Sequence, residues 1–210
     1  MTDPTLMLTG FDSASLAGLA SIAHPIAQVG VWRLEAYGAR GYPTASADIL
    51  VREGGPPRLS VDLALGLDRT ACGDGGASLS PAGMLNLVLN SAREGGYALL
   101  HAAGGGDPTW DSRRLVPGDH YACMPLRPGR YDVANGLGTA RASVRVTWPP
   151  ARASAARPQP SAGPAILTVG ESIEPSDLTI APGRVLLFVV QTPARLTLDL
   201  RTPDDGPTAR

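Results

Sequence analysis

Glycine and proline divide this chain into short segments, and that division constrains the fold more than any other feature of the sequence. The 210 residues include 25 Gly and 20 Pro, and clusters of them separate most of the apolar segments. Both residue types favour turns and weaken helix interiors, so the pattern favours short strands over long helices. The length allows one large β domain or two small ones, each able to bury a hydrophobic core.

Alternation of apolar and polar residues indicates strands in the first 148 residues. Segment 31–37 alternates strictly and places Arg33 and Glu35 on one face, opposite a tryptophan and a leucine. Segments 83–90 and 96–102 also have strand composition and are joined by a short loop, which predicts a hairpin. The fold class predicted from these patterns is mainly β, an antiparallel β-sandwich.

One short helix is predicted near the N-terminus, over residues 12–23. Asp12 or Ser13 supplies an N-cap, and the His24-Pro25 pair ends the segment because the residue before a proline disfavours helical geometry. The apolar stripe that would face the sheet consists of Leu16, Leu19, Ala20 and Ile22.

A Pro/Ala-rich run indicates a linker in the last third of the chain. The predicted organisation is a β-sandwich domain with the helix (1–149), a linker (150–164), a C-terminal β segment (165–203) and a tail (204–210). The C-terminal segment has fewer residues than a stable domain needs. We therefore expect it to dock on the same chain or on a neighbouring one.

The run from Val185 to Val190 is apolar at every position, so both of its faces are apolar. Such a strand is either central and covered on two sides, or it forms an interface. The residues predicted to bind a partner are therefore Val185, Leu187 and Val189. Trp110 is added to this set because it lies in a loop before Asp111.

Charge and residue usage exclude several classes of function. The formal net charge is −1, which disfavours binding to nucleic acid or to an anionic membrane surface. All 18 basic residues are Arg. Without Lys the chain cannot form a lysine Schiff base with a substrate or cofactor, and it cannot contain a Walker-type phosphate loop or a Ser-Lys dyad. No run approaches membrane-spanning length and no secretory signal is recognised, so a cytoplasmic location is expected.

The alternative hypothesis is a metal-binding or redox protein that uses His101, His120 and Cys123. Alternation along a strand places His120 and Cys123 on opposite faces, which disfavours a shared metal. The two cysteines, Cys72 and Cys123, show no zinc-binding spacing, and whether they form a disulfide stays open. No cofactor is predicted.

Segments 115–133 and 174–188 have a rhythm of turns and strands that resembles the closing and opening strands of cupredoxin-like β-sandwich domains, an architecture shared with immunoglobulin-like folds. The resemblance implies a two-layer antiparallel sandwich. In that family a Cys, a His and a Met follow the Pro-Gly-x-Tyr turn and bind copper. Residues 131–138 contain none of the three, so the resemblance implies the scaffold without its copper ligands.

These observations predict a non-enzymatic β-sandwich protein that acts as a structural or accessory subunit of a larger assembly. Its partner is another protein or a second copy of the chain. No triad, nucleophile-elbow or paired-carboxylate pattern is recognised in the sequence, which makes an enzyme the less favoured interpretation.

Overall fold

The fold is mainly β, as the sequence predicts. The computed structural model describes residues 8–63, 77–89, 95–148 and 163–204, and within those ranges it has seventeen strands and no helix. These strands form three sheets, which we call A, B and C.

Sheet A has the strand order β1 (Gly10–Asp12), β17 (Leu196–Pro203), β11 (Gly129–Asn135), β12 (Arg141–Val146) and β15 (Asp177–Ile180). Sheet B has the order β6 (Ala77–Leu79), β4 (Pro43–Val51), β3 (Gly30–Gly38), β8 (Gly96–Ala102) and β9 (Trp110–Asp111). Sheet C has the order β14 (Ile173–Glu174), β13 (Ala165–Val169), β16 (Leu186–Val190), β10 (His120–Cys123), β2 (Ala20–Ile26), β7 (Gly83–Val88) and β5 (Arg58–Asp62).

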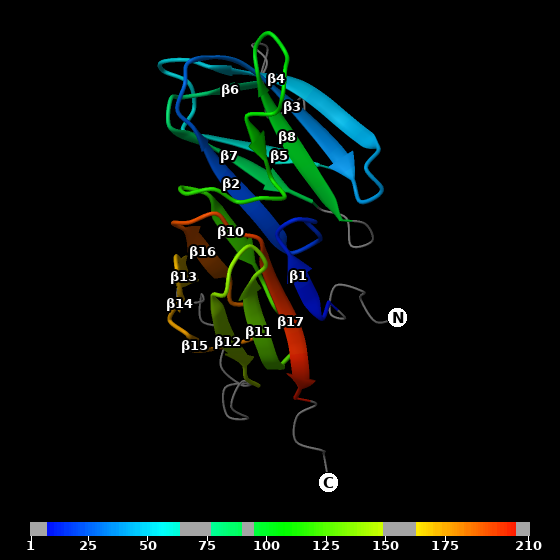
Figure 1. Ribbon diagram of the computed structural model, residues 1–210, viewed down its shortest axis with the longest axis vertical. Coiled ribbons are helices and arrows are strands. Elements are labelled where there is room, and N and C mark those ends of the chain that lie inside the picture. Colours follow the sequence, from blue (N-terminus) through cyan, green and yellow to red (C-terminus); the bar gives the residue numbers. More distant parts are fainter. Residues whose placement is uncertain (1–7, 64–76, 90–94, 149–162, 205–210) are drawn as a thin grey trace, which may run out of the picture.

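The molecule is elongated and has two halves that share sheet C (Figure 1). Sheet B lies at one end with β2, β5 and β7, and sheet A lies at the other end with β10, β13 and β16. Strand β2 is the link, because it pairs with β7 on one side and with β10 on the other. One half is built from the continuous stretch β2–β9, and the other from β10–β17 together with β1.

Alternating side chains build the core between the sheets. In β3, Trp32, Leu34 and Ala36 are buried, whereas Arg33 and Glu35 face outward. The same period of two recurs in β7, β10 and β16. Because one face of each strand is apolar, the buried side chains of all three sheets join into a single cluster.

The sheets are mixed, so the prediction of a purely antiparallel arrangement was wrong. Strand β6 runs parallel to β4, β5 to β7, β13 to β16 and β15 to β12. Each parallel pair arises because the chain leaves one sheet, adds a strand elsewhere and returns. After β4, for example, the chain contributes β5 to sheet C before β6 rejoins sheet B.

The predicted N-terminal helix over residues 12–23 is not formed. Asp12 does accept a hydrogen bond from the backbone N–H of Ala14, but this bond closes a turn instead of capping a helix. Leu19 has a φ of 66°, a left-handed conformation that no right-handed helix contains. Ala20 and Ile22 are both buried because they alternate along β2, so their spacing of two belongs to a strand and not to a helical stripe.

The hairpin predicted from residues 83–90 and 96–102 is also wrong. Strand β7 belongs to sheet C and pairs with β2 and β5, whereas β8 belongs to sheet B and pairs with β3 and β9. The two strands therefore belong to different sheets. Both segments are strands, but local alternation does not reveal which sheet a strand joins.

The C-terminal strands pair with the rest of the same chain. Strand β16 pairs with β10, β15 with β12, and β17 with both β11 and β1. The predicted linker 150–164 lies almost wholly outside the described residues, as does the tail 204–210. Sheets A and C are thus each completed by strands from beyond residue 164.

Candidate functional site

The residues predicted to bind a partner divide between the surface and the core. Leu187 and Val189 are half-buried on the outer face of β16, and Val185, just before the strand, is 38% exposed. Trp110 lies in β9 and is only 4% exposed. Its ring therefore contributes to the interior and not to a contact surface.

Two adjacent rows of side chains lie on the outer side of sheet C, and each row runs across five paired strands. We call these ten residues the outer face of sheet C. One row runs across Ile166, Leu187, Ala122, Ser21 and Val88. The adjacent row runs across Thr168, Val189, His120, Ala23 and Asn86. None of the ten is buried, and Ile166 is 55% exposed.

The ten positions contain no Asp, Glu or Arg, and the charged residues on this side of sheet C are on its two edge strands, where Glu174 pairs with Thr168 and Asp62 with Val88. The outer face of sheet A carries Arg130, Asp132, Arg141, Arg145, Asp177, Asp199 and Arg201. The outer face of sheet B carries Arg33, Glu35, Asp48, His101 and Asp111. Sheets A and B therefore carry outward charges on their central strands, whereas the five inner strands of sheet C carry none.

The three residues of the metal hypothesis lie on three different surfaces. His101 is on the outer face of sheet B, His120 is on the outer face of sheet C, and Cys123 is buried on the inner face of sheet C. Among the described residues no three potential ligands cluster around one point. Burial raises the pKa of the Cys123 thiol, which disfavours the thiolate that metal binding and redox chemistry require. Cys72 lies outside the described residues, so a bridge to Cys123 is not addressed.

A buried polar cluster centred on Asp119 joins the two halves of the molecule. The Asp119 carboxylate is fully buried and accepts hydrogen bonds from His24 Nδ1 at 2.7 Å, Trp110 Nε1 at 3.1 Å and the Val116 backbone N–H at 2.8 Å. The His24 and Trp110 rings stack with their centroids 4.3 Å apart. The cluster therefore fixes β2 and β9 to the turn that precedes β10.

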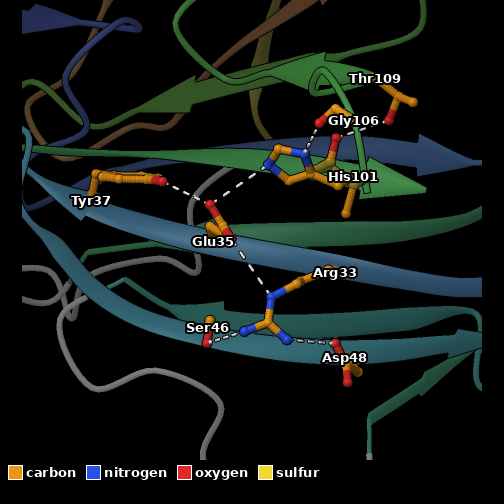
Figure 2. Close-up of polar contacts among 9 residues, drawn as sticks. Arg33, Glu35, Tyr37, Ser46, Asp48, His101, Gly106 and Thr109 are labelled. Atoms are coloured by element: carbon orange, nitrogen blue, oxygen red, sulfur yellow. Dashed lines mark hydrogen bonds and ion pairs between the residues drawn. The ribbon is translucent and has the colours of Figure 1, made fainter. Parts of the chain in front are cut away.

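A second polar cluster lies on the outer face of sheet B (Figure 2). Glu35 is its centre: Oε2 accepts a hydrogen bond from the Tyr37 hydroxyl at 2.7 Å and lies 3.7 Å from His101 Nε2. Arg33 Nε lies 3.6 Å from Glu35 Oε1, and the Arg33 guanidinium also donates to Asp48 and Ser46. The hydrogen bond to Glu35 raises the pKa of Tyr37, so its hydroxyl stays a donor.

Two open hollows flank this cluster, and both are lined by Arg33 and Glu35. The larger has a volume of about 420 Å³ and is also lined by Val31, Asp48, His101 and the glycine loop 102–106. The smaller, of about 390 Å³, extends past Tyr37 to residues 43–46. We call the two together the Glu35 groove.

The sequence predicted only part of these sites. Alternation in segment 31–37 placed Arg33 and Glu35 on one face, but their neighbours on β4 and β8 depend on strand register, which alternation does not give. The Asp119 cluster was missed, because His24, Trp110 and Asp119 are far apart in the sequence and follow no motif.

Comparisons with protein-family models, with curated proteins and with solved structures found no significant match to this chain. The described residues contain no helix that is long and apolar enough to cross a membrane.

Proposed function

We propose that this protein is a non-enzymatic β-sandwich protein that serves as a structural or accessory subunit of a larger assembly and binds another protein through the outer face of sheet C. The observation that supports this proposal is the absence of charge across ten paired positions on five strands, beside two other sheet faces that are charged. Interface cores are depleted of charged residues, whereas ordinary surfaces are not.

The chemistry of the face specifies the kind of partner. Leu187, Val189 and Ile166 offer apolar area, and covering them leaves no ionised group desolvated. A partner surface that is itself apolar and uncharged fits this face, such as the outer face of another sheet. A strongly charged partner does not fit, because its charges would be buried without counterions.

Docking through a face is better supported than addition of a strand at an edge. The two outermost strands of sheet C are β14, which is two residues long, and β5, which presents Arg58 at its start. Short and charged edge strands resist pairing with another chain. The alternative of a metal or redox protein lacks comparable support, because His101, His120 and Cys123 face different surfaces.

The test is the native mass of the protein purified gently from its source, measured by light scattering with the co-purifying chains identified. We expect a complex larger than the chain mass of 21.7 kDa. Leu187→Asp places a charge on the outer face of sheet C, between Ile166 and Ala122, and should reduce the mass to that of the single chain.

Ala134→Asp is the matched control, because it adds the same charge to the outer face of sheet A beside Arg141 and should leave the complex intact. Thermal unfolding of both variants checks that they fold. A wild-type protein that is a lone monomer would refute the proposal, and so would a Leu187→Asp complex of unchanged mass.

A further inference from the structure

Two strands of the outer face of sheet C differ in side-chain size in a complementary way. Strand β16 presents Leu187 and Val189, which are aliphatic and half-buried. Strand β2 presents Ser21 and Ala23, which have short side chains. Strand β10 lies between these two strands and pairs with both of them. The face therefore has a ridge on β16 and a trough on β2, on opposite sides of β10.

A face with this profile can pack against a second copy of itself. When two copies meet face to face, the two-fold axis that relates them lies in the plane between the two sheets. If this axis runs along β10, the ridge of each copy enters the trough of the other, and the strands of the two sheets are aligned. An axis across the strands would place ridge on ridge and trough on trough, which leaves a gap and loses dispersion contacts.

The axis along β10 also matches polarity at the outer strands of the face. Strand β13 of one copy then faces β7 of the other, because each is two strands from β10. Ile166 lies on Val88 of the second copy, so an apolar side chain is covered by another apolar side chain. Thr168 lies on Asn86 of the second copy, and its hydroxyl can donate to the amide oxygen. At the axis, His120 faces His120 of the second copy, and one neutral imidazole can donate to the other.

The charged residues at the edges of sheet C are compatible with this arrangement. Strand β14 of one copy faces β5 of the other, which brings Glu174 opposite Ser60 of the second copy. Arg58 and Asp62 lie on either side of that serine. Each Glu174 therefore approaches one cation and one anion at the rim of the interface, where solvent and salt screen both. The edges neither drive nor prevent the association.

The size of the face sets the strength of the association. Five strands at a spacing of about 4.8 Å span about 24 Å. Along the strands, the two rows and the half-buried Pro25–Met84 pair beyond them span about 20 Å. Two copies therefore bury on the order of 1,000 Å², which is the lower limit for a specific interface. A dimer of this size is reversible, with a Kd on the order of micromolar.

We propose that the partner of the outer face of sheet C is a second copy of this chain, an inference that rests on the proposed function. The two copies form a face-to-face dimer whose two-fold axis follows β10, and β16 of each copy packs on β2 of the other.

The experiment is analytical ultracentrifugation of the full chain, purified alone, from about 1 µM to about 200 µM, a range that brackets a micromolar Kd. We expect the mass to rise from 21.7 kDa towards twice that value. Leu187→Asp and Ser21→Arg each place an unpaired charge in the interface, and each should weaken the association by at least about 100-fold.

Mixing these two variants tests which strands face each other. In a mixed dimer, the new carboxylate at position 187 faces the new guanidinium at position 21 of the other copy, and the second Leu187–Ser21 contact is that of the wild type. The mixture should therefore dimerise with a Kd within about tenfold of the wild-type value. Ala134→Asp is the matched control, because it adds a charge to the outer face of sheet A and should leave the dimer unchanged. Thermal unfolding checks that every variant folds.

The inference is overturned if the chain purified alone stays a monomer over the whole range, if Leu187→Asp leaves the dimer intact, or if the mixture stays monomeric. The complex isolated from the source separates this failure from that of the proposed function. A complex that contains a different chain and is lost with Leu187→Asp overturns the dimer alone. A complex that survives Leu187→Asp overturns both.

Discussion

Replacement of Asp119 by alanine is expected to lower the free energy of unfolding by roughly 3 to 5 kcal/mol. The substitution leaves three donors without their acceptor, those of His24, Trp110 and the Val116 backbone. Each unsatisfied buried donor costs about 1 to 3 kcal/mol. The His24 side chain is 14% exposed, so water can reach part of the cluster and reduce the sum. The loss is a large fraction of the roughly 5 to 15 kcal/mol typical of a folded domain.

Replacement of Asp119 by asparagine should cost only about 1 kcal/mol, because the hydrogen bond between residue 119 and His24 can reverse its direction. In the wild type, Oδ2 accepts from Trp110 and Val116, and Oδ1 accepts from His24 Nδ1. The Asn oxygen can take the Oδ2 position and its NH2 group the Oδ1 position. His24 must then move its hydrogen from Nδ1 to Nε2 in order to accept that new hydrogen bond.

Urea unfolding gives the stabilities, and nitrogen NMR of the histidine rings reports which nitrogen carries the hydrogen. Asp132→Asn serves as the control, because its exposed ion pair with Arg201 contributes at most about 1 kcal/mol. The reasoning is refuted if the Asp119→Asn protein loses as much stability as the Asp119→Ala protein. It is equally refuted if His24 carries its hydrogen on Nε2 in the wild type.

Two further predictions concern alkaline pH and backbone strain. Burial raises the pKa of Cys123 and Tyr121 and raises that of Tyr131 to about 12, so the folded state keeps these protons while the unfolded chain releases them. Stability is therefore complete below about pH 8 and falls as the pH rises through the thiol pKa of about 8.5 in the unfolded chain. At pH 10 Cys123 alone accounts for about 2 kcal/mol of this fall. Urea unfolding of Cys123→Ala between pH 8 and 10 should show a shallower fall, and an equal slope would contradict the assignment. Ala82 is exposed and has a φ of 59°, so Ala82→Gly should raise the free energy of unfolding by up to about 1 kcal/mol, and thermal unfolding that shows a loss would contradict this.

Local patterns predicted strands well, because alternation is a property of the strand itself. Segment 31–37 was predicted as a strand and lies within β3, and the apolar run 185–190 contains β16. The helix over 12–23 failed because a few buried residues in a bent segment can match a helical spacing by coincidence. There Leu16 is buried by a bridge to Gly96, a contact that the local sequence does not encode.

The sites were less predictable than the strands because they depend on pairing between distant segments. Trp110 was expected at the surface because the residues around it have loop composition, yet Asp119 and His24 hold it in the interior. The Glu35 groove likewise needs the register that places His101 opposite Arg33. Alternation did place Leu187 and Val189 on one face of a strand, and their role in binding a partner stays a prediction.

The pairing of β1 with β17 has a consequence for synthesis on the ribosome. Strands β2 to β9 are consecutive, so the half that contains sheet B can assemble while the rest of the chain is still being made. Strand β1 emerges first, but its partner is more than 180 residues downstream, where Phe11 is paired with Leu198. Until then the apolar side chain of Phe11 stays uncovered. The unpaired strand β1 is therefore a place where a nascent chain can pair wrongly with other proteins.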